Sequence, residues 1–314
     1  MLKKFILIIG TAIFSMSVTF AQQGSFVVNE IEGNISQGKQ TGFEILIPEA
    51  QVKDIESALS KWTKSNKGKI VINKKSPEIF QDNVLLTSVS ENTVDMYTTL
   101  SQENEGVRLR TYVDLGGAFL TSAGHPQAFA AMEGVLIEFA RNQYTSKVDE
   151  DIKNEEKHFS KLQSELKTLE KQNESYNKDI ASNKDNIQKQ ELAITKNELD
   201  QKTKEQQIGL QQEILLAARQ KKNSMGNVDA ATKKMLDNQV KTEEKSLKSF
   251  ESQLKKLKSE YSSSVSSIEK SKSTIAQREQ DIIKNEEDQN TKRQQIELQK
   301  QIIEAVKTKR SGIQ

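Results

Sequence analysis

The sequence predicts an α+β protein, in which a small antiparallel-sheet head with two helices on one face is followed by a long antiparallel coiled-coil helical hairpin. All three prolines and the only tryptophan lie before residue 146, and only three of the 14 glycines follow it. Beyond residue 146, apolar side chains recur every seven residues in two ladders, as in paired helices. We therefore expect a head domain over 22–145, a hairpin over 146–310 and a short tail over 311–314.

Composition excludes several classes of protein. Charged residues make up 29% of the 314 residues and apolar residues only 34%, against about 45–50% in globular domains. Cysteine is absent, which excludes a disulfide scaffold, a cysteine-ligated metal site and a thiol nucleophile. The low apolar content also excludes a protein with several membrane spans. We expect no cofactor and no metal.

The first 21 residues have the pattern of a secretory signal peptide. Lys3 and Lys4 precede a largely apolar stretch over 5–20, and Ala21 offers a small residue for cleavage. Cleavage would remove two of the 46 basic residues and leave 44 against 44 acidic ones. The head would then carry a net charge of −4 and the hairpin +4. We expect export to the periplasm, the outer surface or the medium, with no transmembrane span after cleavage.

Alternating apolar residues predict the strands of the head, and a period of 3.6 predicts its two helices. The expected strands are Ser25–Ile31, Phe43–Ile47, Lys69–Lys74, Asn83–Val89, Thr93–Leu100 and Val107–Val113, with a turn at 103–106. The first helix should start at Pro48 and end at Gly68, with Val52, Ile55, Leu59 and Trp62 on one stripe. The second should start near Pro126 and bury Phe129, Met132, Leu136 and Phe139.

The two ladders predict the seam of the hairpin. One consists of Ile152, Phe159, Leu166, Asn173, Ile180, Ile187, Ile194, Gln201, Ile208 and Leu215. The other consists of Val240, Leu247, Leu254, Tyr261, Ile268, Ile275, Ile282, Gln289, Ile296 and Ile303. Asn223, Gly226 and Asp229 lie between them and favour a turn. Arms of about 146–222 and 229–309 would thus flank a turn at 223–228.

The second seam position, three residues after each ladder residue, is often polar. Arm one has Asn183, Gln190 and Asn197 there, and arm two has Ser264 and Ser271. A half-polar seam is typical of coiled coils in which register matters more than tightness. The alternative is a seam that closes only with a second chain or another helix. The serine-rich segment 259–273 is the least helix-prone part and a candidate flexible point.

One segment of the head has the spacing of a phosphate-binding loop. Gly33, Gly38 and Lys39 match part of the pattern G-x-x-x-x-G-K-[ST], but Gln40 follows the lysine and Thr41 comes one place late. A strand rather than a helix follows, so we interpret the segment as a glycine-rich turn. A long hairpin also invites comparison with chromosome-organising and DNA-repair ATPases, whose similarity would cover only the coil, because their ATPase head is missing.

Two surface features are candidate sites. Asp114, Gly116 and Gly117 end the last strand, where paired glycines permit a tight turn or an anion-binding nest. Basic residues gather near the hairpin turn and are candidates for contact with an anionic envelope surface or a partner: Arg219, Lys221, Lys222, Lys233 and Lys234. The alternative for the glycines is a close-packed turn beneath the second helix, and the alternative for the basic residues is solvation alone. Nucleic acid is not an expected partner, because aromatics are not interleaved with the basic residues.

The layout resembles secreted proteins of Bacteroidota-type bacteria that join a small head to a long coiled coil. The residues behind this resemblance are Gln22-Gln23, Phe43–Pro48, the Trp62 helix, Asp114–Phe119 and the C-terminal coil. The resemblance implies a non-enzymatic role and assigns no catalytic residue. Our hypothesis is an exported structural or adaptor protein that uses its hairpin for protein–protein interaction, self-association or spacing. A ligand- or peptide-binding head and an enzyme with an unrecognised site in the head are the alternatives.

Overall fold

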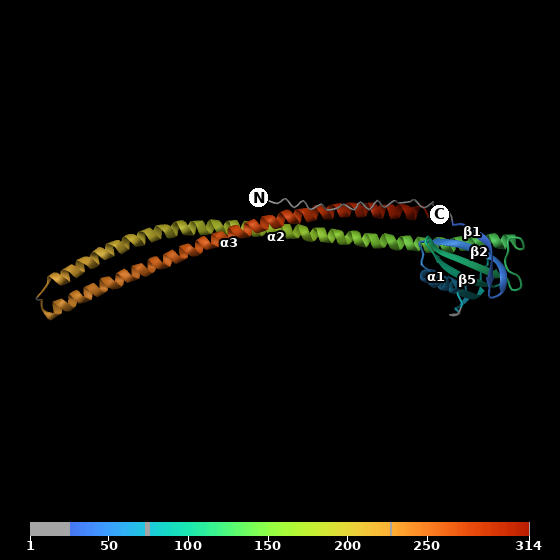
Figure 1. The fold of residues 1–314 in the computed structure, drawn as a ribbon, viewed down its shortest axis with the longest axis horizontal. Helices are drawn as coiled ribbons and strands as arrows, with labels where there is room; N and C mark the ends of the chain where they lie inside the picture. Colours follow the sequence, from blue (N-terminus) through green and yellow to red (C-terminus); the bar gives the residue numbers. More distant parts are fainter. Residues whose placement is uncertain (1–25, 73–75, 227, 314) are drawn as a thin grey trace, which may run out of the picture. The chain divides into compact units, whose positions relative to one another are not determined.

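The computed structural model describes residues 26–72, 76–226 and 228–313 (Figure 1). The predicted signal peptide lies outside these residues. Contacts divide the chain into two compact units, Met1–Ser160 with Glu297–Gln314, and Lys161–Ile296. The first unit contains the head and the ends of the two long helices, so the division falls beyond the compositional boundary at residue 146.

The head contains one antiparallel sheet with the strand order β1-β2-β6-β5-β4-β3. Its strands are β1 (Val28–Ile35), β2 (Gly38–Pro48), β3 (Lys69–Ile72), β4 (Glu78–Val84), β5 (Val94–Glu103) and β6 (Gly106–Asp114). Helix α1 (Val52–Ser65) connects β2 to β3, and helix α2 (Pro126–Ser224) follows β6. The expected turn at 103–106 is present, because β5 ends at Glu103 and β6 begins at Gly106.

The core lies on one face of this sheet. Phe43, Thr111, Thr98 and Ile79 are aligned across β2, β6, β5 and β4, and each is at most 5% exposed. Phe129 of α2 stacks on Phe43 with 4.3 Å between the ring centroids. The helices add further buried side chains to the same cluster: Ile55, Leu59, Met132, Leu136 and Phe139. The predicted core faces of both helices are thereby confirmed, although Trp62 is only partly buried.

The start of α1 differs from the prediction. Pro48 ends β2 instead of opening the helix, because the strand continues to pair with β6 as far as Gly106. Glu49 then turns the chain with a φ of 55°, and its N–H donates to the carbonyl of Glu105 at 2.8 Å. The helix therefore begins only at Val52.

The end of α1 also uses a different residue from the one predicted. Lys67, not Gly68, adopts the left-handed conformation, with a φ of 59°. The N–H of Lys67 donates to Lys64 and that of Gly68 to Thr63, at 3.1 and 2.9 Å. This pair of hydrogen bonds is a Schellman motif, which satisfies two carbonyls at the helix end.

The fourth strand is displaced from its predicted position. It spans Glu78–Val84 rather than Asn83–Val89, and Asn83 interrupts the pairing with β5 through a φ of 56°. Leu86 and Val89 are nevertheless buried, at 5% and 8% exposure. The apolar pattern thus predicted correctly that Leu86 and Val89 are buried, but it was wrong to predict that they lie in a strand. The first strand is displaced in the opposite direction, from the predicted Ser25–Ile31 to Val28–Ile35.

The rest of the chain forms two long helices, α2 of 99 residues and α3 (Ala230–Ser311) of 82 residues. They pair as an antiparallel hairpin (Figure 1), which confirms the predicted fold class. Within the first unit, the C-terminal end of α3 returns to the head, where Lys309 contacts both carboxylate oxygens of Glu49 at 2.6 Å. None of the helices in the described residues is long and apolar enough to span a membrane.

Candidate interaction surface of the helical hairpin

Every residue of the two predicted ladders is buried or half-buried in the structure. The apolar members pack between the arms, and Leu215, Ala218 and Val240 form a small buried cluster at the end nearest the turn. Two cations of the polar seam positions cover aromatic rings. Lys204 lies over Phe250, with 4.9 Å from Nζ to the ring centroid, and Arg278 lies over Tyr176, with 5.1 Å from Cζ to the ring centroid. The seam is therefore closed within one chain.

Amides in the seam donate to the backbone of the opposite arm. The side-chain N–H of Gln211 donates to the carbonyl and the carboxylate of Glu243, at 3.2 and 2.6 Å. Asn197 donates to the carbonyl of Leu257 at 3.0 Å. Both amides are less than 10% exposed, so a shifted register would leave them buried without a partner. These contacts select one register of the two arms.

The serine-rich segment 259–273 is helical along its whole length, contrary to its low propensity. Ser271 is 4% exposed and accepts a hydrogen bond from the side chain of Asn186 at 2.9 Å. Its small side chain leaves room for the asparagine amide within the seam. Tertiary packing thus overrides propensity here.

The turn between the arms lies where the sequence places it. Helix α2 ends at Ser224 and α3 begins at Ala230, with Asp229 as the N-cap of α3. The Asp229 carboxylate accepts hydrogen bonds from the hydroxyl of Thr232 at 2.7 Å and from the N–H groups of Thr232 and Ala231 at 2.8 and 2.9 Å. These hydrogen bonds lower the pKa of Asp229.

The other two predicted turn residues have no such contact. Asn223 is an exposed residue of the last turn of α2, and Gly226 is exposed. A Cβ placed on Gly226 would meet no atom within 4 Å, so this glycine has no steric requirement. The aspartate is therefore the residue that defines where α3 begins.

Two of the five basic residues near the turn pair with the opposite arm. Arg219 contacts Glu244 at 2.7 Å, and Lys222 contacts Asp237 at 2.5 Å. Hydrogen bonds from these cations lower the pKa of both carboxyl groups. All four side chains are more than a third exposed, so these pairs contribute little stability and mainly align the ends of the arms.

The remaining three basic residues face solvent. Lys221, Lys233 and Lys234 are exposed, and no ion pair joins them to any of the described residues. Several large apolar side chains of the hairpin are exposed as well: Leu192, Leu199, Leu210, Ile214, Leu216, Met225, Met235 and Ile283. The outer surface of the second unit therefore offers both apolar side chains and unpaired positive charge.

In the head, the candidate nest after β6 is filled by the chain itself. The carboxylate of Asp114 accepts hydrogen bonds from the N–H groups of Gly116 and Gly117 at 2.9 and 3.2 Å. Both glycines have a positive φ, of 92° and 153°, which other residues rarely adopt. The backbone donors that could hold an anion are thus satisfied by an internal carboxylate.

The segment that resembles a phosphate-binding loop is a β-hairpin. Strands β1 and β2 join at Ser36 and Gln37, and Gly38 follows with a φ of 88°. Lys39 pairs across the hairpin with Glu32 at 2.6 Å. No helix follows the lysine, so the segment lacks the helix N-terminus that phosphate binding requires.

A tyrosine explains two glycines of this hairpin. A Cβ on Gly33 would lie 2.0 Å from the hydroxyl of Tyr112, and one on Gly42 would lie 2.4 Å from its ring. Tyr112 therefore lies flat across β1 and β2, and its burial raises the pKa of its hydroxyl.

The turn between β1 and β2 also contacts β4. Ser36 in this turn donates from its N–H and its hydroxyl to the Glu78 carboxylate at 3.0 and 2.5 Å.

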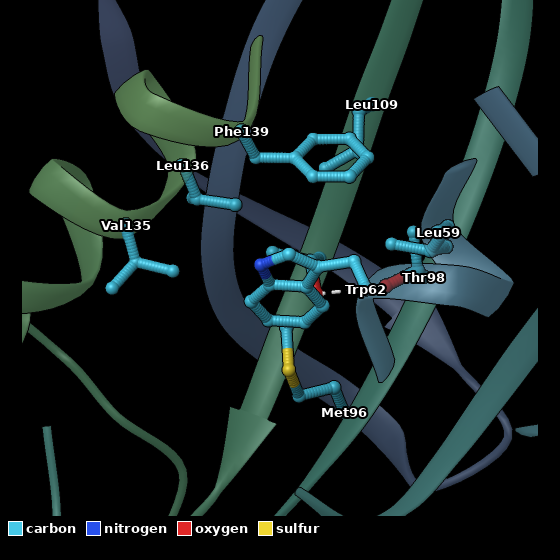
Figure 2. Close-up of a pocket in the computed structure, with 9 residues that line it drawn as sticks. Leu59, Trp62, Met96, Thr98, Leu109, Val135, Leu136 and Phe139 are labelled. Atoms are coloured by element: carbon cyan, nitrogen blue, oxygen red, sulfur yellow. Dashed lines mark hydrogen bonds between the residues drawn. The ribbon is translucent and has the colours of Figure 1, made fainter. Parts of the chain in front are cut away.

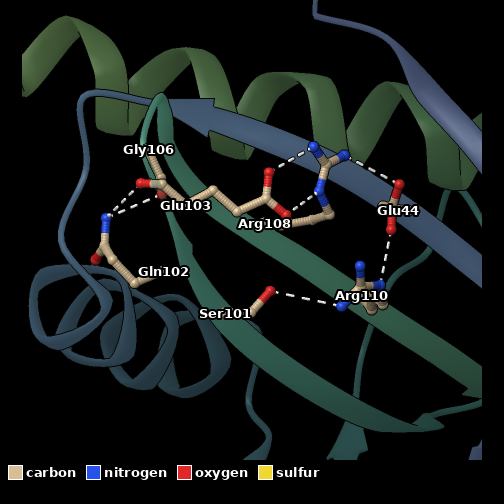
Figure 3. A network of polar contacts seen from close by, with 7 residues as sticks. All are labelled: Glu44, Ser101, Gln102, Glu103, Gly106, Arg108 and Arg110. Carbon is tan, nitrogen blue, oxygen red and sulfur yellow. Dashed lines mark hydrogen bonds and ion pairs between the residues drawn. The ribbon is translucent and has the colours of Figure 1, made fainter.

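A charged network that the sequence analysis did not identify covers part of the sheet face opposite the core (Figure 3). Arg108 donates to both oxygens of Glu103, at 2.5 and 2.7 Å, and to Glu44 at 3.0 Å. Arg110 donates to the other oxygen of Glu44 at 2.7 Å. Arg108 and Arg110 lie two residues apart and therefore on the same face of β6. That Glu44 of β2 lies beside them follows only from the pairing of β2 with β6.

A second group that the sequence analysis missed is a chain of polar side chains inside the core. Gln81 donates to Thr63 at 2.8 Å and accepts from Thr98 at 2.7 Å, while Thr98 and Thr111 share a hydrogen bond of 2.9 Å. A cavity of about 10 Å³ lies beside this chain of side chains and is lined by Trp62, Thr98 and Thr111, among other residues (Figure 2). That volume has room for about one water molecule and not for a substrate.

No group of three or more histidine, aspartate or glutamate side chains that could hold a metal ion occurs among the described residues. No protein-family model matches the sequence, and no curated protein matches it. Fold and seam define the class of protein: a small α+β head joined to a coiled-coil hairpin, an architecture compatible with protein interaction or self-association.

One solved structure with some similarity is the Smc head domain with a coiled coil and joint derived from Pyrococcus yayanosii. The sequence identity is 13% and the TM-score 0.25, with 92% of this chain and 70% of that chain covered. A TM-score this low supports no inference about the function of this chain.

Proposed function

We propose that this chain is an exported structural or adaptor protein, which presents its coiled-coil hairpin for protein–protein interaction or spacing in the cell envelope. The observation that carries the proposal is the closure of the seam within one chain. The side-chain amides of Asn197 and Gln211 donate hydrogen bonds to backbone carbonyls of the opposite arm, so the two helices pair with each other. The outer faces of the arms are then left for a partner.

Two further observations favour the hairpin over the head as the interacting part. The hairpin exposes large apolar side chains such as Leu192, Leu199 and Leu210, each more than 60% exposed, and Leu192 and Leu199 lie one heptad apart on the same face of α2, where a partner could contact both. In the head, the carboxylate of Asp114 accepts hydrogen bonds from the Gly116 and Gly117 amides, and the cavity beside Trp62 has room for only about one water molecule. Neither feature suits a bound substrate or peptide.

A paired deletion tests the role of the hairpin. Removing 187–200 and 254–267 takes two heptads from each arm, including the Asn197–Leu257 contact, and keeps the Gln211–Glu243 contact in register. The head and the turn remain unchanged. Chemical cross-linking in intact cells, followed by mass spectrometry, should capture envelope partners with the full chain and lose those along the arms with the shortened one. An identical set of partners would contradict the proposal.

Export is tested separately. We expect the mature protein in the envelope or medium to begin at Gln22, which N-terminal sequencing of the purified chain would reveal. Replacing Lys3 and Lys4 by glutamate should retain the chain in the cytoplasm, because the positive charge before the apolar stretch is part of the signal. A wild-type chain that begins at Met1 in the cytoplasm would contradict export.

A further inference from the structure

The seam of the hairpin ends in lysines on both arms. Continuing the spacing of seven toward the turn leads from Leu215 to Lys222 on α2 and from Val240 to Lys233 on α3. An apolar residue at these positions would extend the buried cluster of Leu215 and Val240. Two lysines instead bring like charges to the same end of the seam. The ion pair with Asp237 accounts for Lys222 in the folded hairpin, whereas Lys233 forms no ion pair among the described residues.

The start of α3 also carries positive charge. Lys233 and Lys234 lie just beyond the first turn, while α3 has no acidic residue in that turn. The N-terminus of a helix carries a partial positive charge, which the carboxylate of the N-cap Asp229 offsets and which lysines do not. On α2, by contrast, Lys221 and Lys222 lie in the last turn, where a cation is favourable. Positive charge is thus concentrated around the turn even at the helix end where it does not favour helix formation.

Exposed apolar side chains lie among these lysines. Met225 is 40% exposed in the turn itself, and Met235 is 61% exposed one residue after Lys234. Unbranched methionine side chains adapt to irregular apolar surroundings. Basic and apolar side chains side by side are the combination that binds the interface of an anionic membrane. We name the set of Lys221, Lys233, Lys234, Met225 and Met235 the basic tip.

We propose that the basic tip docks on an anionic phospholipid surface, with the lysines on the lipid phosphates and the methionines in the interfacial region. The complementary charge comes from three exposed lysines that form no ion pair among the described residues, although Lys233 lies near enough to Asp237 to help lower the pKa of that carboxyl group. Solvent-exposed methionines favour lipid over an acidic protein surface, which would satisfy the lysines alone. The inference deepens the proposed function, because it names the surface that the hairpin would reach.

The test uses the full mature chain and sedimentation with vesicles. Vesicles of phosphatidylcholine mixed with phosphatidylglycerol should carry the protein into the pellet, vesicles of phosphatidylcholine alone should not, and added salt should release it. Each lysine near an anionic surface changes the partition constant about fivefold. The triple variant K221Q/K233Q/K234Q should therefore lower the partition constant by roughly a hundredfold.

A matched variant separates local charge from net charge. K189Q/K196Q/K202Q removes three exposed lysines of α2 away from the turn and should lower binding far less. M225S/M235S should weaken binding while keeping its dependence on salt. Circular dichroism should show unchanged or higher helix content in K221Q/K233Q/K234Q, since two of its changes relieve the unfavourable charge at the start of α3.

Three results would overturn the proposal: wild-type protein that stays in the supernatant with phosphatidylglycerol vesicles, equal losses in the two triple variants, or no effect of M225S/M235S. None of them would remove the partners found along the arms by cross-linking. Failure of the lipid proposal is therefore distinguishable from failure of the proposed function.

Discussion

The head and the hairpin both bury polar side chains, but they use them differently. In the head, Thr63, Gln81, Thr98 and Thr111 are fully buried and form a continuous chain of hydrogen bonds, which ends where Thr63 donates to the carbonyl of Leu59 in its own helix. In the hairpin, amides such as Asn197 reach across the seam to backbone carbonyls of the other arm.

This difference separates two tasks. The head is held by apolar packing, and its polar chain only has to satisfy its own members. The hairpin has a thin apolar seam that could slide by one heptad, so its polar contacts must distinguish one register from the next. Substitutions in the head should therefore change stability strongly, and substitutions in the hairpin should act on local structure.

The largest effect should come from Phe43→Ala. Phe43 is fully buried and stacks on Phe129, so its removal should lower the free energy of unfolding of the head by about 3–5 kcal/mol. Fluorescence of Trp62, the only tryptophan, follows the head alone in a urea titration. Val27→Ala, at a side chain 59% exposed, is the control and should change stability by less than about 0.5 kcal/mol. Equal effects would place the core elsewhere.

The next effect should come from Gly42→Ala. The new methyl group would meet both the ring of Tyr112 at 2.4 Å and the backbone carbonyl of Thr111 at 2.6 Å. Such crowding typically costs about 1–3 kcal/mol, which the same titration would measure. Gly134→Ala is the matched control, because no atom lies within 4 Å of its Cβ in helix α2. That variant should be more stable by about 0.5–1 kcal/mol.

A smaller loss should follow from Gln81→Leu. The side chain is fully buried between Thr63 and Thr98. Both threonines keep one partner, since Thr63 donates to the carbonyl of Leu59 and Thr98 bonds to Thr111. We therefore expect a loss of about 1 kcal/mol, near the lower end for broken buried hydrogen bonds. A loss as large as that of Phe43→Ala would show that the polar chain, rather than packing, holds the head.

The two regions also differ in how far the sequence predicted them. In the hairpin, contacts repeat every seven residues, so local spacing was enough to predict both ladders and a turn before α3. In the head, the contacts of Gly42 with Tyr112 and of Glu44 with Arg110 join residues distant in sequence. Strand order decides such contacts, and periodicity contains no information about it.

Within the candidate surface, residue types were predictable and their partners were not. The five basic residues near the turn were found from composition, but their division into paired and unpaired cations depends on the register of the arms. Lys222 meets Asp237 because the two arms are antiparallel and aligned. Asp229 was expected only as a turn residue, and its role as N-cap follows from three hydrogen bonds to its carboxylate.

The smallest and most local effect concerns pH at the start of α3. Hydrogen bonds from Thr232 hold the pKa of Asp229 below its usual 3.8. A depressed folded-state pKa means that the ionised carboxylate stabilises the cap fully above pH 3.8 and that this contribution is lost as pH falls through the lower folded-state pKa. Exchange of the Thr232 amide hydrogen should accelerate only in that acidic range, relative to an amide in the middle of α3.

Asp229→Asn separates the charge from the cap in this experiment. Asparagine caps a helix about as well as aspartate but does not titrate, so Thr232 should stay protected and lose its acidic transition. Asp229→Ala removes the acceptor and should leave the Thr232 amide unprotected at every pH. A transition that persists in Asp229→Asn would assign the titration to another carboxylate. Protection of the Thr232 amide that persists in Asp229→Ala would show that α3 begins independently of its aspartate. The turn would in that case be specified by the closing seam alone, as the rest of the hairpin is.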